Sequence, residues 1–159
     1  MIPQEILSTL QTAFPGAILD AKVEGVTDPA IIVARDRIRE ICLFLRDDEK
    51  LRCDSLMCLS GVDLTGGKLS VVYHLHSLKW NHKIVLKVNL AADDPHCQSV
   101  AGIWRSADWL EREAYDMIGI IFDGHPDLRR ILMPDDWEGY PLRKDYQVPE
   151  YYHGMKVPY

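Results

Sequence analysis

The sequence has 159 residues, the length of one domain, and its 47% hydrophobic and 26% charged residues are the balance of a folded globular protein. A formal net charge of −6 disfavours nucleic-acid binding, because contacts to phosphates require a basic face. No apolar run approaches the roughly 18 residues that span a bilayer, and the start MIPQEILSTL has no cationic leader, so neither direct membrane insertion nor a secretory signal is expected.

The first third of the chain alternates helical and strand patterns. Pro3 opens an amphipathic helical pattern, which Pro15–Gly16 ends. The alternation of apolar and polar residues from 19 to 24 predicts a half-buried strand, and the apolar run Ala30–Ala34 predicts a second strand. Residues Arg35–Glu49 place apolar side chains at helical spacing and predict a second helix.

Three strand-like runs follow, at residues 54–62, 68–78 and 83–90. Short segments rich in turn-forming residues separate them, so we expect the three strands to pair as an antiparallel meander. Residues 92–98 are expected to form a loop that leads into a third helix, which ends near Met117.

The predicted fold class is α+β. We expect a two-layer sandwich of helix, two strands, helix and three strands in a mixed sheet, then one further helix and an irregular extended C-terminal tail. Residues 1–120 are expected to form the core and residues 121–159, rich in Pro, Arg and Tyr, the tail of the same single domain unit.

The cysteines and histidines provide no complete metal-binding motif. Cys42, Cys53, Cys58 and Cys97 form no Cys-x-x-Cys pair, so we expect reduced and mostly buried thiols. His74 and His76 share the polar face of a predicted strand, but no partner stands at a telling spacing. In DGHPD, residues 123–127, Gly and Pro predict a tight turn rather than a ligand cluster.

The third predicted helix carries the carboxylates Glu111, Glu113 and Asp116. Helical geometry distributes them around the helix instead of directing them into one pocket, and Asp108 and Arg112, four residues apart, can pair. Guanidinium groups bind carboxylates through two parallel hydrogen bonds, so downstream arginines are the expected partners. These arginines are Arg129, Arg130 and Arg143. Such a network either pins the tail to the helix or continues into a partner protein.

Three segments closely resemble the signature of one subunit family, the C subunit of proton-pumping NADH:quinone oxidoreductase, respiratory complex I. They are SADWLEREAYDMIGI at 106–120, GHPDLRRILMP at 124–134 and PLRKDY at 141–146. The similarity extends more loosely to residues 60–63 and 71–75, and the tail PEYYHG resembles the bacterial members.

The resemblance implies a peripheral-arm subunit with no catalytic residue, cofactor or metal of its own. FMN, iron–sulfur clusters and quinone are then held by other subunits of a complex that couples electron transfer from NADH to proton translocation. The expected partners in this hetero-oligomer are the D subunit and neighbouring cluster-bearing subunits, at the cytoplasmic face of the cell inner membrane. The residues expected to serve structure or partner binding are Glu111, Arg112, Glu113, Asp116, His125, Asp127, Arg129, Arg130, Arg143, Lys144, Asp145 and Tyr146.

Two other functions stay open at this point. Membrane-bound hydrogenases, and complexes that take electrons from a donor other than NADH, carry similar subunits, and the sequence does not identify the electron donor. The second alternative is an independent metal-dependent enzyme that uses His74, His76 and His125. A tightly bound stoichiometric metal in the purified chain would favour that enzyme.

Overall fold

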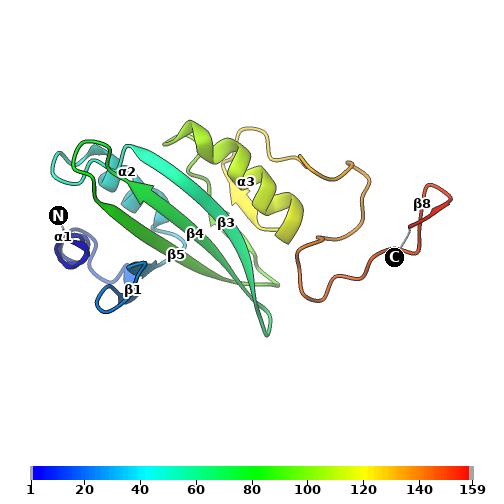
Figure 1. Ribbon diagram of the computed structural model, residues 1–159, viewed down its shortest axis with the longest axis horizontal. Helices are drawn as coiled ribbons and strands as arrows, with labels where there is room; N and C mark the ends of the chain where they lie inside the picture. The colour runs from blue at the N-terminus through cyan, green and yellow to red at the C-terminus, as the bar shows by residue number, and fades with distance from the viewer. Residues whose placement is uncertain (1, 158–159) are drawn as a thin grey trace.

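The computed structural model describes residues 2–157 (Figure 1), so Pro158 and Tyr159, the last residues of the predicted tail, lie outside the described residues. The elements in chain order are α1 (Pro3–Ala13), β1 (Ile18–Lys22), β2 (Ala30–Val33), α2 (Ile38–Asp47), β3 (Ser55–Thr65), β4 (Lys68–His76), β5 (Lys83–Ala91), β6 (His96–Gln98), α3 (Arg105–Ile118), β7 (Ile121–Asp123), β8 (Tyr151–Tyr152) and β9 (Met155–Lys156). This order confirms the predicted α+β fold class.

The main sheet has the strand order β1-β2-β5-β4-β3. β3, β4 and β5 pair in antiparallel fashion, which confirms the predicted meander. β5 also pairs with β2 in parallel, and β2 pairs with β1 in antiparallel fashion, so the sheet is mixed.

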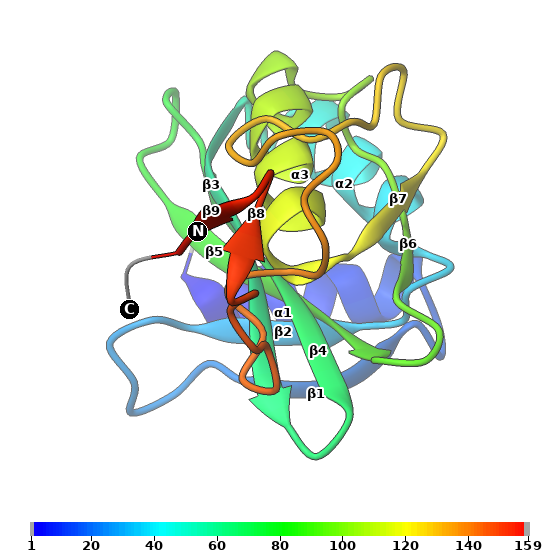
Figure 2. The same ribbon diagram turned by 90° about the vertical axis from the view of Figure 1, so that its right-hand side faces the viewer.

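The core lies on one face of this sheet. Every second residue of β4 from Leu69 to Leu75 is buried, and these residues share one hydrophobic cluster with Ile6 of α1, Ile41 of α2 and Ala114 of α3. The three helices therefore cover the same face and form the second layer of the sandwich. The tail leaves the domain at the end of α3, on the side away from the N-terminus (Figures 1 and 2).

A glycine on β3 allows α3 to approach the sheet closely. A Cβ atom at Gly61 would lie 3.0 Å from Cδ1 of Ile120, 3.2 Å from Cβ of Ala114 and 3.3 Å from Cγ1 of Ile118. Only a residue without a side chain fits this gap without displacing its neighbours. Gly61 thus sets the separation between α3 and the sheet.

Two short strand pairs escape the sequence prediction. Residues 92–98 were expected to form only a loop, which is wrong, because β6 within them pairs in parallel with β7. Phe122 of β7 is 2% exposed, so the packed core continues beyond residue 120. In the tail, β8 and β9 form a hairpin whose turn residues His153 and Gly154 both have positive φ. Strands of two or three residues are too short to produce a recognisable alternation.

No helix within residues 2–157 is long and apolar enough to cross a bilayer.

The first prediction concerns Gly61. Replacing Gly61 with Ala is expected to lower the free energy of unfolding by about 1–3 kcal/mol, because the added methyl group overpacks the contact between α3 and β3. Gly102→Ala is the matched control, since its added Cβ would meet only the flexible Arg39 side chain, at 4.0 Å. Urea titrations of both variants measure the effect, and equal stability of the two would contradict this account of the packing.

Candidate functional site

Helix α3 buries charged residues as well as apolar ones. Of the expected apolar stripe, Ala114, Met117 and Ile118 are buried and Leu110 is partly buried. Glu111 and Asp116 are also fully buried, Arg112 is 8% exposed, and Glu113 faces solvent. Charged groups inside a protein must be paired or hydrogen-bonded, because transfer from water is costly. The partners of these buried charges define the candidate site.

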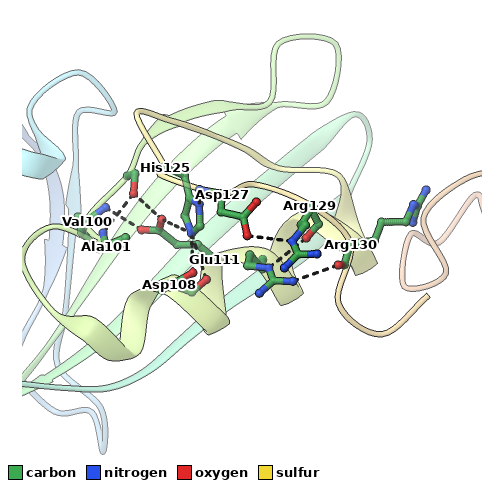
Figure 3. Close-up of polar contacts among 10 residues, drawn as sticks. Val100, Ala101, Asp108, Glu111, His125, Asp127, Arg129 and Arg130 are labelled. Atoms are coloured by element: carbon green, nitrogen blue, oxygen red, sulfur yellow. Dashed lines mark hydrogen bonds and ion pairs between the residues drawn. The ribbon is translucent and has the colours of Figure 1, made fainter. Parts of the chain in front are cut away.

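Glu111 holds the turn that precedes α3 (Figure 3). Its Oε2 accepts a hydrogen bond of 2.6 Å from the Ser99 hydroxyl, and its Oε1 accepts one of 2.7 Å from the N–H of Val100. The Ser99 oxygen in turn accepts a hydrogen bond from the N–H of Ala101. Burial raises the pKa of Glu111 to about 7, although the bonds from Ser99 and Val100 favour the ionised form.

His125 closes this network from the opposite side. Its side chain is fully buried, and its Nδ1 accepts a hydrogen bond of 3.0 Å from the N–H of Asp127. An accepting Nδ1 places the proton on Nε2, which lies 3.1 Å from the carbonyl oxygen of Asp108 and 3.3 Å from its Oδ1. Nε2 is also 3.9 Å from Oε2 of Glu111. The pair of Asp108 and Arg112 that their spacing allows does not form among the described residues, and His125, distant in sequence, lies beside Asp108 instead.

Asp116 receives four hydrogen bonds. Arg130 donates to its Oδ1 at 2.7 Å, and the N–H groups of Ile131, Leu132 and Met133 donate to its Oδ2 at 3.0, 2.7 and 2.8 Å. Three successive amides aimed at one oxygen form an anion-binding concavity. Burial opposes ionisation, yet the hydrogen bonds, with that of Met133 first, lower the pKa of Asp116. The expected pairing of a helix carboxylate with a downstream arginine is confirmed for Asp116 and Arg130.

Arg130 and Arg112 fasten the following segment to α3. Arg130 donates through Nη2 to the carbonyl oxygens of Trp137 and Gly139, at 2.8 and 3.0 Å. Arg112 donates to the carbonyl oxygens of Arg129 and Arg130, each at 3.3 Å. Both guanidinium groups therefore bind backbone carbonyl groups of residues 129–139, and that of Arg130 also binds the carboxylate of Asp116.

Tyr140 sits between two arginines at the end of α3. The guanidinium carbons of Arg130 and Arg143 lie 5.5 and 5.2 Å from the centre of its ring, within the range of cation–π attraction. Arg143 also donates to the carbonyl oxygen of Ile118 at 2.6 Å. The ring covers Gly119, whose φ of 81° and distance of 2.5 Å from a built Cβ to Tyr140 exclude a side chain there.

The other signature residues lie nearer the surface. Asp127 and Arg129 form an exposed ion pair at 2.8 Å. The N–H of Lys144 donates to Asp63 at the end of β3, and the hydroxyl of Tyr146 accepts a hydrogen bond of 2.9 Å from Trp137. Within residues 2–157, Glu113 and Asp145 are exposed and form no ion pair or hydrogen bond through their side chains.

The histidines considered for metal binding do not come together. His74 and His76 project from the side of β4 that faces away from the helices, whereas His125 is buried against α3. No group of three or more His, Cys, Asp or Glu side chains that could hold a metal ion occurs in the described part of the chain.

Sequence reasoning missed several residues of the site. Ser99 and Asp63 lie in other elements, and no local pattern connects them to Glu111 or Lys144. Gly119 could have been found, because a glycine directly after the last apolar residue of a helix is a common C-terminal signal. The charged residues are brought together as a network that ties one segment to one helix.

Comparison with known proteins identifies the family. Residues 31–152 match the family described as "Respiratory-chain NADH dehydrogenase, 30 Kd subunit". The chain belongs to this family. The resemblance predicted from the α3 signature is thereby confirmed.

Relatives in this 30 kDa family are named as the C subunit of NADH-quinone oxidoreductase. One from Chloroherpeton thalassium is 59% identical over 125 residues, and one from Salinispora arenicola is 44% identical over 162 residues. The alignments cover 78% and 97% of this chain, but 52% and 66% of the two relatives. The chain thus spans between half and two-thirds of the length of these proteins.

Two solved structures share the fold. Nqo5, solved as a trypsin-resistant fragment (1–134), has a TM-score of 0.65 and 28% identity, and the alignment covers 80% of this chain and 100% of that chain. A chain of the membrane-bound sulfane sulfur reductase, an archaeal respiratory membrane complex, has a TM-score of 0.75 over 91% of this chain and 85% of that chain. At 24% identity, the second similarity shows the fold alone.

The second prediction is a pH dependence that Glu111 causes. A carboxyl whose pKa rises from 4.5 in the unfolded chain to about 7 in the folded chain stabilises the fold fully below pH 4.5. That contribution is lost as the pH rises through 7. Relative to Glu111→Gln, which does not titrate, the wild type should lose roughly 2–3 kcal/mol of unfolding free energy between pH 5 and pH 8.

Urea titrations at several pH values measure the unfolding free energy of the wild type and of Glu111→Gln. All other titrating groups are the same in both proteins, so their contributions cancel in the difference between the two. The carboxylates with a lowered pKa, such as Asp116, titrate below this window. Parallel curves for the wild type and Glu111→Gln from pH 5 to 8 would contradict the prediction.

The third prediction separates Asp116 from Glu113. Asp116→Asn leaves Arg130 without its carboxylate and turns an amide toward three N–H donors, so a loss of about 3–5 kcal/mol in unfolding free energy is expected. Glu113→Gln should change stability by less than about 0.5 kcal/mol, since an exposed residue without a partner contributes little. Thermal unfolding at pH 7 tests both, and similar losses in the two variants would contradict the assignment.

Proposed function

We propose that this member of the 30 kDa family is a non-catalytic structural subunit in the peripheral arm of an NADH:quinone oxidoreductase, where it docks on the D subunit. The supporting observation is how α3 uses its charges, because Glu111, Arg112 and Asp116 are buried and bound to groups of the chain itself. Charges committed in this way fix the shape of a surface instead of acting on a substrate.

The segment that follows β7 carries exposed apolar side chains. Those on the segment after β7, each more than half exposed, are Leu132, Leu142, Val148, Tyr151 and Met155. A concentration of exposed apolar side chains on one segment marks a site of protein contact. The exposed charges beside them, which suit the polar rim of an interface, are Glu113, Arg129, Lys144 and Asp145.

In this proposal the redox groups belong to other subunits. FMN, iron–sulfur clusters and quinone are held by partners in a hetero-oligomer that transfers electrons from NADH to quinone and translocates protons. The protein is held at the cytoplasmic face of the cell inner membrane through the D subunit and neighbouring cluster-bearing subunits. The family name and the names of the relatives support this role.

A second candidate is the equivalent subunit of a complex that receives electrons from a donor other than NADH. The fold shared with the archaeal sulfane sulfur reductase complex favours it. Proteins that co-purify with the chain from detergent-solubilised membranes distinguish the two candidates. Flavin-bearing, NADH-oxidising subunits support the first, and their absence from an otherwise complete complex supports the second.

The tail has contacts of its own as well as contacts to α3. The rings of Trp137 and Tyr152 are 4.9 Å apart, and Asp136 accepts hydrogen bonds from the Tyr152 hydroxyl and from Nε2 of His153, at 2.8 and 2.6 Å. These groups are largely at the surface, where such contacts contribute little free energy. We infer that residues 138–157 are mobile in the free protein and become ordered on the partner.

The fourth prediction is that truncation after Gly139 leaves the α+β core folded but weakens recovery of the D subunit. The trypsin-resistant fragment of Nqo5, which aligns with 80% of this chain, supports a core that is stable without the rest of the chain. Circular dichroism of the truncated chain reports the fold, and a pull-down reports the partner. Leu142→Glu in the full chain should also lower recovery, whereas Leu78→Glu, similarly exposed in the β4–β5 turn, should not.

Hydrogen exchange on the free full-length chain is an independent check. Residues 138–157 should exchange much faster than β3, β4 and β5. Strong protection from Arg143 to Tyr152 without a partner would show that the tail belongs to the core, and the docking role of the tail would then be wrong.

A further inference from the structure

The sheet has a second face, which the helices do not cover. Along β4, every second residue from Leu69 to Leu75 points into the core, so the residues between them point to the opposite side. Residues that pair with one another across neighbouring strands point to the same side of the sheet, so β2, β3 and β5 have the same two sides. We call this side the open face and define it by Ile32, Val72, His74, Lys83, Val85 and Lys87.

The open face is cationic in a chain whose net charge is −6. Lys83 and Lys87 project from β5, and no carboxylate occupies an outward position on β3, β4 or β5. Neither lysine forms an ion pair with any residue between 2 and 157. The nearest acids by register and sequence are Asp20, paired with Ile32, and Asp28 in the turn before β2. Two cations therefore lie on this face without an ion pair to another described residue.

A hollow of about 380 Å³ lies at one end of the open face. Its walls include Pro29 and Val85, the cross-strand partners Cys58 and His74, and Met57 at a β-bulge, where the side chain is 55% exposed. The charged residues Asp28 and Lys83 also line it. The Nδ1 atom of His74 is buried and has no hydrogen-bond partner among the described residues. A buried nitrogen without a partner is costly, and a hydrogen-bonding group from a docked molecule would satisfy it.

We infer that the open face is a second docking surface, which binds an extended, acidic segment of another subunit of the complex. Lys83 and Lys87 are four residues apart on one strand, so their Cα atoms are separated by about 13 Å. Two carboxylates four residues apart on an extended segment have the same spacing. An apolar side chain of that segment fills the hollow beside Val85, and a polar group next to it binds Nδ1 of His74.

The chemistry of the open face favours a protein segment over a nucleic acid or a membrane surface. A nucleic acid or an anionic membrane surface presents many phosphates, and two lysines provide too few contacts for them. The hollow also presents Pro29, Met57 and Val85, which suit an apolar side chain better than a phosphate. The inference goes beyond the proposed docking through the tail, because Leu142 and Arg143 of the tail contact Met117 and Ile118 of α3, on the other side of the sheet.

Photo-crosslinking in the assembled complex identifies the occupant. Met57, at the rim of the hollow, is replaced with p-benzoylphenylalanine, the complex is irradiated and isolated, and the crosslinked peptide is sequenced by mass spectrometry. The expected peptide comes from another subunit of the complex and contains two Asp or Glu residues four positions apart. A crosslink to phospholipid, to nucleic acid or to a segment without such a pair, or no crosslink, overturns the inference.

Charge reversal tests the two lysines. Lys83→Glu combined with Lys87→Glu should lower the amount of this protein retained in the complex about tenfold at 0.15 M salt, since two attractive contacts become repulsive. The matched control is Lys50→Glu with Lys79→Glu, which changes the net charge equally at exposed sites away from the open face. Equal retention of the two double variants overturns the inference.

A rescue experiment distinguishes a lost contact with the partner from misfolding of the double variant. The acidic residues found in the crosslinked peptide are changed to lysine in the partner, and retention of Lys83→Glu with Lys87→Glu should then recover. Lys83→Gln with Lys87→Gln should show an intermediate loss and an unchanged circular dichroism spectrum. A tail-truncated chain that still crosslinks through position 57 would show that this surface acts independently of the tail.

Discussion

The arrangement of α3 and of the segment that follows it depends on the hydrogen bonds to one carboxylate. Asp116 has no contact with water, and an ionised carboxylate is tolerated there because four donors surround it. Three of these donors are backbone N–H groups of residues 131–133, which come after β7 and belong to no helix or strand. The carboxylate therefore supplies the hydrogen bonds that regular secondary structure would otherwise provide.

Two carboxyl groups of α3 are accommodated by different chemistry. In the middle of the helix, Glu111 accepts hydrogen bonds from Ser99 and Val100 of the preceding turn, and burial raises its pKa. Farther along, Asp116 meets a guanidinium and stays ionised. Glu111 and Asp116 are thus part of the core, and hydrogen bonds to Asp116 hold residues 130–133 in place. Residues 129–133 are therefore already in place before a partner binds, so the entropy lost on docking falls on the tail that follows them.

Much of the fold could be predicted from sequence, because the strands of the meander alternate clearly and the first two helices have one apolar face. The candidate site could be predicted only in part. Helical periodicity treats charged residues as outward-facing, so it does not anticipate that Glu111 and Asp116 are buried while Glu113, between them, is exposed. The spacing of Asp108 and Arg112 indicates a pair on an isolated helix, but His125 is a better partner for Asp108 in the folded chain. Contacts between residues far apart in sequence leave no periodic signal.

The position of β5 between β2 and β4 has a consequence for how the chain folds during synthesis. β2 has β1 on one side, and its other edge stays unpaired until residues 83–91 have left the ribosome. During that interval the apolar run Ala30–Val33 presents an open edge, which is the kind of surface that recruits other nascent strands. The parallel pairing also closes a loop of some fifty residues, a slow step compared with the formation of the neighbouring hairpins. Synthesis of the meander therefore provides the strand that covers this edge.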